Sequence, residues 1–454
     1  MAGKLHAYPS YKYSGIEWLS DIPESWVVMR GKFVFYEFGD RSQTGDETLL
    51  SVSEYYGVKP RGEVIDEGEF LSRAESLVGY KKCNKNDLVM NIMLAWRRGL
   101  GVTKYDGIVS PAYSVFRFYK NASPDYMHYL LRTDIYTGHF KTRSTGVIDS
   151  RLRLYPESFG NVSILLPPIP EQNKIVNFLD HETAKIDTLI EKQQQLVKLL
   201  KEKRQAVISD AVTKGLNPNA PMHDSGVEWL GEVPEHWDVK RLRYLGTCQN
   251  GINIGAEYFG SGYPFVSYGD AYKNEVLPKS VIGLVQSTEI DRETYSVLAG
   301  DVIFTRTSET IDEIGFSSTC LSTIENASFA GFLIRFRPKH NVLEAGFSKY
   351  YFRNILMRIF FIKEMNLVTR ASLSQDLLKK LPVTLPSLKE QRQIAEFLDE
   401  KSSVFSKLTE NAKSAIQLMK ERRTALISAA VTGKIDVRNW QASRQNQNNK
   451  ENAA

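Results

Sequence analysis

The chain has 454 residues, a net charge of +5 and 42% hydrophobic residues, the composition of an ordinary globular protein. Its length exceeds that of one ordinary domain, so we expect two or three hydrophobic cores. The mildly basic balance allows nucleic-acid binding without requiring it. No apolar run approaches the ~18 residues of a membrane span, and the first residues lack the apolar core of a signal peptide. We therefore expect a cytoplasmic protein that does not bind membranes.

A tryptophan-containing box near the start of the chain recurs in its second half. Ser14–Arg30 reads SGIEWLSDIPESWVVMR, and Ser225–Arg241 reads SGVEWLGEVPEHWDVKR. Four of the six tryptophans of the chain lie in these two boxes, which is too many for coincidence. The chain is therefore an internal repeat of two related halves.

A globule of mixed secondary structure is expected after each box. Asn86-Asp87 precedes Leu-Val-Met, and Gly300-Asp301 precedes Val-Ile-Phe; both segments are typical of a turn that enters a buried strand. Helical stretches occur as well, for example the one that begins at Tyr350. The mixture predicts two tandem α+β globules, one within residues 1–165 and one within residues 217–384.

A long helix is predicted after each globule. The stretch 171–213 contains no proline or glycine and ends at Lys214-Gly215, a good helix stop. Leu166–Asp180 (LPPIPEQNKIVNFLD) and Leu385–Asp399 (LPSLKEQRQIAEFLD) show that the two helices open alike. Apolar residues follow at heptad spacing. The residues predicted to form the helix seam are Ile175, Leu179, Ile186, Leu189, Leu196, Leu200, Ile394, Leu398, Phe405, Leu408, Met419 and Leu426.

The two long helices need a partner. A helix of about 43 residues is roughly 65 Å long, and an amphipathic helix of that length does not bury its seam alone. We expect spacer helices within residues 166–216 and 385–437 that pack antiparallel as a coiled coil, relating the halves by a pseudo-two-fold axis. The alternative is that each helix docks separately on its own globule. Residues 438–454, rich in Asn and Gln toward the end, are predicted to be a disordered tail.

A search for catalytic motifs gives only negative results. The chain lacks the Asp/Asn-Pro-Pro-Tyr/Phe motif of adenine methyltransferases and a GxxxxGK[ST] phosphate loop. Asp238-Val-Lys240 could end a nuclease motif, but its match in the first box is Val27-Val-Met29, which excludes a shared role. The cysteines and histidines form no CxxC, HxxxH or HExxH pair. We therefore expect no metal site, no cofactor and no active site in this chain.

The boxes and the helix openings resemble those of type I restriction-modification specificity subunits. The resemblance extends from about Tyr13 to Val437 and includes the order of the segments. It implies that each globule is a target recognition domain that reads one half of a split sequence in double-stranded DNA. It also implies that the helices set the spacing between the two half-sites and bind two methyltransferase subunits. Translocase-nuclease subunits would then complete the complex. S-adenosylmethionine, ATP and magnesium would then bind the partner subunits.

The residues expected to contact DNA follow from the chemistry of base edges and phosphates. Side chains with two donors or acceptors read bases, and cations bind phosphates. Loops that follow buried strands offer such side chains on a rigid frame. The candidates in the first globule are Trp96, Arg97, Arg98, Arg143, Arg151 and Arg153, and those in the second are Tyr268, Lys273, Arg306 and Arg370.

Two other functions remain open on the sequence. The chain could be the specificity subunit of another assembly that contains a methyltransferase. It could also be a coiled-coil scaffold protein whose globules ignore DNA, in which case DNA binding by the complex would be absent or insensitive to salt.

Overall fold

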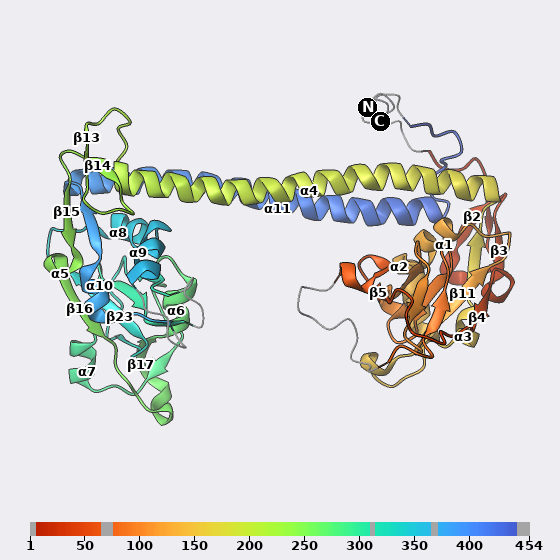
Figure 1. Ribbon diagram of the computed structural model, residues 1–454, viewed down its shortest axis with the longest axis horizontal. Helices are drawn as coiled ribbons and strands as arrows, with labels where there is room; N and C mark the ends of the chain where they lie inside the picture. The colour runs from red at the N-terminus through yellow and green to blue at the C-terminus, as the bar shows by residue number, and fades with distance from the viewer. Residues whose placement is uncertain (1–5, 65–75, 309–313, 365–370, 443–454) are drawn as a thin grey trace. The chain divides into compact units, whose positions relative to one another are not determined.

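The computed structural model describes residues 6–64, 76–308, 314–364 and 371–442. The chain falls into two compact units (Figure 1). Unit 1 comprises the residues up to Gln193 and those from Ser414 onward, and unit 2 comprises Gln194–Lys413. The long helices α4 (Ile169–Lys214) and α11 (Leu388–Val431) therefore each contribute one part to each unit.

Unit 1 is built around a four-stranded antiparallel sheet. The strand order is β4 (Phe35–Phe38), β11 (Tyr113–Phe118), β8 (Leu88–Asn91) and β9 (Leu100–Val102). Every residue of β8 is buried, as expected for a strand in the middle of a sheet. Strand pairs complete the unit: β1 (Tyr11–Tyr13) with β2 (Asp21–Pro23), β3 (Val27–Arg30) with β12 (Ser163–Leu166), β5 (Leu50–Ser53) with β6 (Gly57–Pro60), and β7 (Lys81–Cys83) with β10 (Gly107–Val109).

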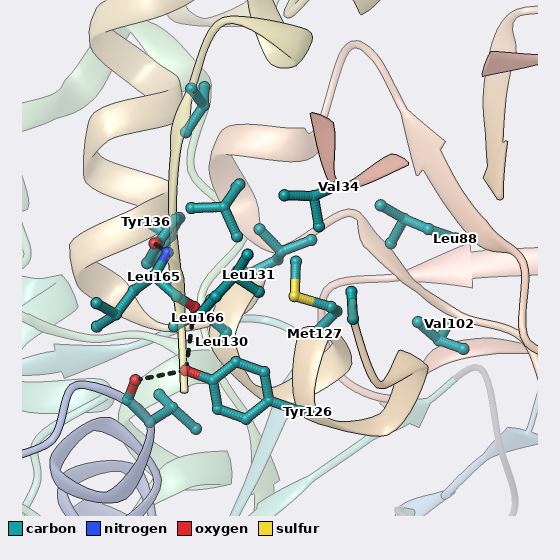
Figure 2. Close-up of a cluster of buried hydrophobic side chains, with 14 of the residues drawn as sticks. Val34, Leu88, Val102, Tyr126, Met127, Leu130, Leu131, Tyr136, Leu165 and Leu166 are labelled. Carbon is teal, nitrogen blue, oxygen red and sulfur yellow. Dashed lines mark hydrogen bonds between the residues drawn. The ribbon is translucent and has the colours of Figure 1, made fainter. Parts of the chain in front are cut away.

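The helices of unit 1 cover this sheet and meet the long helices in one core. They are α1 (Pro124–Leu131), α2 (Asp134–Arg143) and α3 (Pro156–Gly160). Figure 2 shows part of this core, in which Met127, Leu130 and Leu131 of α1 lie among residues of the strands. The strand residues labelled there are Leu88, Val102, Leu165 and Leu166. The Tyr126 hydroxyl donates to the carbonyl oxygens of Leu165 at 3.2 Å and Val431 at 3.1 Å, which ties α1 to the end of α11.

Unit 2 has a four-stranded antiparallel sheet with the same order along the chain. The order is β16 (Gly246–Asn250), β23 (Leu333–Pro338), β19 (Val302–Thr305) and β21 (Ser317–Thr319). The predicted turns before β8 and β19 are confirmed, and in each the aspartate carboxylate accepts a backbone N–H at 2.8 Å and pairs with an arginine of the neighbouring strand: Asp87 with Arg117 and Asp301 with Arg337.

The remaining elements of unit 2 flank that sheet. The helices are α5 (Leu242–Leu245), α6 (Tyr268–Lys273), α7 (Glu289–Thr294), α8 (Ala345–Tyr351), α9 (Leu356–Glu364) and α10 (Gln375–Lys380). The other strands are β13 (Met222–Asp224) with β14 (Glu232–Pro234), β15 (Asp238–Arg241) with β25 (Pro382–Leu385), β17 (Phe259–Val266) with β18 (Leu284–Val285) and β22 (Ser328–Phe329), and β20 (Thr307–Ser308) with β24 (Ala371–Ser372). The predicted mixture of strands and helices in each globule is confirmed.

Each unit brings the start of one long helix to the end of the other. In unit 1 the Arg423 guanidinium of α11 donates to both carboxylate oxygens of Asp187 of α4, at 2.8 and 3.2 Å. In unit 2, Val212 near the end of α4 shares a core with Ile394 near the start of α11. Within each unit the two helix parts therefore run in opposite directions.

The predicted seam is buried only in part. Ile175, Leu179, Ile186, Ile394 and Leu398 are buried, and all but Ile186 belong to a hydrophobic core of their unit. Three seam residues are more than 40% exposed and belong to none of these cores, so their packing between the two helices stays a prediction: Leu189, Leu196 and Leu408. A globule covers a wide stripe of a helix, whereas a neighbouring helix covers only a narrow one. The other predicted seam residues, Leu200, Phe405, Met419 and Leu426, are half-buried.

The first residues of the predicted disordered tail, 438–440, contact unit 1. The Arg438 guanidinium binds the Asp436 carboxylate at 2.7 Å and lies 4.9 Å from the ring of Tyr8. Trp440 packs edge-on against Phe178 of α4, with ring centroids 5.3 Å apart. The prediction is wrong for these residues because an aromatic ring and a buried valine before it anchor them to unit 1. Residues 443–454 of the predicted tail lie outside the described residues.

Candidate nucleic-acid interface

The loop after β8 carries the first group of predicted DNA contacts. It forms a 3₁₀ turn over Ala95–Arg97 and leaves Arg98 with a backbone φ of 63°. That left-handed conformation is uncommon for a residue with a side chain. The next residue is Gly99, and a side chain does not fit at this position because its Cβ would lie 2.5 Å from the Cβ of Leu94. The loop is therefore a tight, fixed turn at the end of a buried strand.

The side chains of this loop already have partners within unit 1. The Trp96 indole N–H donates to the Met93 carbonyl at 3.1 Å, and its half-buried ring lies 4.9 Å from the Lys141 ammonium. Arg97 pairs with Glu54 at 3.3 Å, and Arg98 pairs with Asp134. The half-buried Trp96 packs against the core of unit 1. The two arginines are partly exposed, and their carboxylate partners are exposed or half-exposed.

The segment after α2 lies beside that loop. The Leu154 N–H donates to the Ile92 carbonyl at 2.8 Å, which joins the two segments. Arg143 ends α2, and Arg151 and Arg153 follow it; all three side chains are exposed. The structure thus brings the six predicted contacts of the first globule onto two adjacent segments of unit 1.

Two predicted contacts of the second globule, Arg306 and Tyr268, lie around the end of β19. Arg306 is half-buried, and its backbone is fixed because its N–H donates to the Phe332 carbonyl at 2.9 Å and its carbonyl accepts from Leu373 at 2.7 Å. The Tyr268 hydroxyl donates to the Thr307 carbonyl at 2.8 Å, so α6 lies beside this strand end. Lys273, the last residue of α6, is exposed. Arg370 lies outside the described residues.

Two arginines that the sequence analysis missed hold these segments. Arg132 directly follows α1, and Arg353 follows α8. Each donates to four or more backbone carbonyl oxygens of its own unit, and neither forms an ion pair among the described residues. The available signal was the match between Tyr129-Leu-Leu-Arg132 and Tyr350-Tyr-Phe-Arg353.

A polar hollow of about 230 Å³ opens in unit 1 next to Arg132. Its lining comes from the turn between β5 and β6, from α1, from the start of α2 and from the part of α11 that carries Arg423. His128 lines it, and the Val102 N–H donates to the Nδ1 atom of His128 at 3.2 Å. Burial, followed by the charges of Arg132 and Lys104, lowers the pKa of His128 to about 3, so the imidazole is neutral.

Among residues 6–442 outside the three internal gaps, no group of three or more His, Cys, Asp or Glu side chains is placed to hold a metal ion. In the same described residues, no helix has the length and apolar character needed to cross a membrane.

The chain was compared with known protein families. Residues 234–418 match the family model described as the type I restriction modification DNA specificity domain. This match covers the second sheet, Arg306, Arg353 and the first part of α11. The resemblance to type I specificity subunits is confirmed.

Curated relatives extend that match to both halves of the chain. The EcoKI specificity subunit of Escherichia coli K12 is 23% identical over 337 residues, 72% of this chain and 69% of that protein. The MjaVIII specificity subunit of Methanocaldococcus jannaschii is 24% identical over 445 residues, 92% of this chain and 95% of that protein. These relatives support the predicted role as a DNA sequence-specificity subunit.

Two solved structures share the fold of this chain. A chain from a study of complex assembly and conformational transition of the type I R-M system gives a TM-score of 0.69 at 17% identity, covering 90% of this chain and 98% of that chain. The HsdS subunit from Thermoanaerobacter tengcongensis gives 0.55 at 17% identity, covering 91% and 98%.

Proposed function

We propose that this chain is the non-catalytic DNA sequence-specificity subunit of a type I restriction-modification complex. Each unit reads one half of a split, asymmetric DNA site, and α4 and α11 pair as an antiparallel coiled coil that sets the distance between the half-sites. The halves are related by a pseudo-two-fold axis. The observation that carries the proposal is the repeated sheet order, with the end of the third strand of each sheet leading into a different arginine-bearing loop.

The physical chemistry of the loops supports DNA as the ligand. Arg97 and Arg98 in unit 1 and Arg306 in unit 2 offer planar guanidinium groups that match the O6 and N7 atoms of guanine. The exposed Arg143, Arg151 and Arg153 suit phosphates, which require charge but little geometry. The ion pairs of Arg97 and Arg98 are partly exposed, so exchanging a carboxylate for a phosphate or a base costs little.

The remaining activities belong to partner subunits in this proposal. Two methyltransferase subunits bind the long helices and the tryptophan boxes and carry S-adenosylmethionine. Translocase-nuclease subunits carry ATP and magnesium. This chain binds none of the three cofactors and works in the cytoplasm.

Single-molecule methylome sequencing tests the proposal. DNA is sequenced from cells that express the chain with its neighbouring methyltransferase and from matched cells that lack the chain. We expect adenine methylation at one split, asymmetric motif only when the chain is present. Arg306→Ala should relax one half-site only. If the assembled complex neither methylates a split motif nor binds DNA in a salt-dependent way, the scaffold function replaces this one.

A further inference from the structure

Arg132 holds two separate segments of unit 1 at once. Its Nη1 atom donates to the carbonyl oxygens of Arg98 at 2.7 Å, of Ser53 at 3.4 Å and of Leu100. Its Nη2 atom donates to those of Glu54 at 2.9 Å and Tyr55 at 3.3 Å. One guanidinium therefore ties the turn between β5 and β6 to the loop that carries Arg97 and Arg98.

The geometry around Arg132 leaves little freedom for these segments. Gly57, at a φ of 82°, closes the β5–β6 turn, and a Cβ there would lie 2.9 Å from the His128 ring and 3.6 Å from Arg132. The carbonyl that accepts the 2.7 Å bond belongs to Arg98, the residue with the left-handed backbone. Such a conformation is strained for a residue with a side chain and persists only where the surroundings fix it. Arg132 is a large part of those surroundings.

Arg353 likewise holds separate segments of unit 2 together. Its Nη1 atom donates to the carbonyl oxygens of Ser317 at 2.7 Å, Asn274 at 3.1 Å and Ala271 at 3.4 Å, and its Nη2 atom to that of Tyr272 at 3.0 Å. The last three acceptors are at the C-terminal end of α6, where a cation is favourable. Arg353 thus fixes the helix that carries Tyr268 and Lys273 and that binds Thr307 of β20, two residues after the end of β19.

Both arginines occupy the same place relative to the long helices. Three residues before Arg132, the Tyr129 hydroxyl donates to Asp180 of α4 at 2.7 Å. Three residues before Arg353, the Tyr350 hydroxyl donates to Asp399 of α11 at 2.6 Å. Each short helix is therefore bound to a long helix by its tyrosine and to the predicted DNA-contacting segments by its arginine.

We infer that Arg132 and Arg353 are positioning residues that fix the DNA-contacting segments of their own units, so that each controls discrimination in a different half-site. The inference rests on the proposed function. A planar guanidinium with several donors can hold diverging carbonyl groups in one geometry, whereas a lysine ammonium is a flexible point charge with fewer directions. Replacing the arginine by lysine keeps the charge and releases the segments.

The experiment is methylome sequencing with the full chain in its methyltransferase complex, carrying Arg132→Lys or Arg353→Lys. We expect each variant to methylate near-cognate sites that differ by one base in one half-site, at a level at least about fivefold above the wild type. The other half-site and the spacer length should stay strict, and the two variants should relax opposite half-sites. Arg132→Gln and Arg353→Gln repeat the test without the charge.

Arg335→Lys is the matched control. Arg335 is 5% exposed and also binds backbone carbonyl oxygens in unit 2, but its partners are Ser296, Thr294 and the Gln249 side chain, none of which belongs to α6 or to the segment that carries Arg306. It should lower methylation at all sites equally without changing the motif.

Several outcomes would overturn the inference. A uniform loss of methylation with an unchanged motif, as in the control, would make both arginines merely structural. Relaxation of the same half-site by both variants, or an unchanged motif with lysine and glutamine alike, would also refute it. If the wild-type complex itself gave no split motif, the proposed function would fail first, and the inference with it.

Discussion

The Trp26 indole N–H donates to a carboxylate oxygen of Glu171 at 2.8 Å, which fastens the first tryptophan box to the opening of α4. The Tyr8 hydroxyl donates to the same oxygen at 2.7 Å, and the whole cluster is buried. In unit 2 the Trp237 indole donates to Glu390 of α11 at 3.0 Å. The tryptophan box and the helix opening are the two best-matched segments of the repeat. In each unit they therefore contact each other.

Removal of the Glu171 carboxylate should destabilise unit 1. In Glu171→Ala, two buried donors lose their acceptor, so we expect the free energy of unfolding to fall by about 3 kcal/mol. Urea denaturation followed by tryptophan fluorescence measures this. Glu390→Ala is the matched comparison and should cost less, because its second partner, His236, is largely exposed. Equal and small effects of both variants would contradict the role assigned to the buried contact.

The stability of unit 1 should decrease in mild acid because of His128. The folded pKa of about 3 lies below the ordinary value of 6.5, so the unfolded chain binds a proton that the folded chain excludes. The contribution is fully present above pH 6.5 and is lost as pH falls from there toward 3. It amounts to about 5 kcal/mol at most, and to less because His128 lines the hollow and is only half-buried.

The variant His128→Asn isolates that effect. An asparagine oxygen can still accept the Val102 N–H but does not titrate. Thermal melting at pH 7, 6, 5 and 4 should show a shallower decline for His128→Asn than for the wild type. Parallel declines would show that other groups cause the acid sensitivity.

The partial burial of the helix seam predicts unequal costs along α4. Ile175 is fully buried, so Ile175→Ala should lower the free energy of unfolding by about 2–5 kcal/mol. Leu189 is 47% exposed, so Leu189→Ala should cost less than about 1 kcal/mol. Chemical denaturation of the two variants side by side measures both. A large cost at Leu189 would restore the continuous seam that the heptad pattern predicts.

Arg153 should contribute to DNA affinity without base preference. Its side chain is exposed and forms no ion pair with the described residues. If it binds one phosphate, Arg153→Ala weakens the complex on all sequences and lowers the slope of log affinity against log salt by about 0.9. Fluorescence anisotropy at several salt concentrations measures the slope. Lys240→Ala, which removes an exposed cation already paired with Asp238, should leave it unchanged.

The repeat, the mixed globules and the two long helices were predictable from the sequence. The helix predicted over 171–213 is α4, Ile169–Lys214, within two residues at each end. Local rules suffice for this, because helix starts, stops and apolar spacing are encoded in neighbouring residues. The turns at Asn86-Asp87 and Gly300-Asp301 were predictable for the same reason.

Which parts of these segments are buried, and which contacts hold the loops, depends on how distant parts of the chain pack together. Heptad spacing marked Leu189 and Ile175 as equivalent, but only Ile175 faces the strands and helices of unit 1. Arg132 and Arg353 look like surface cations in the sequence, because their acceptors are backbone carbonyls of segments distant along the chain. A backbone carbonyl is present at every residue, so its partner is fixed by the path of the folded chain alone.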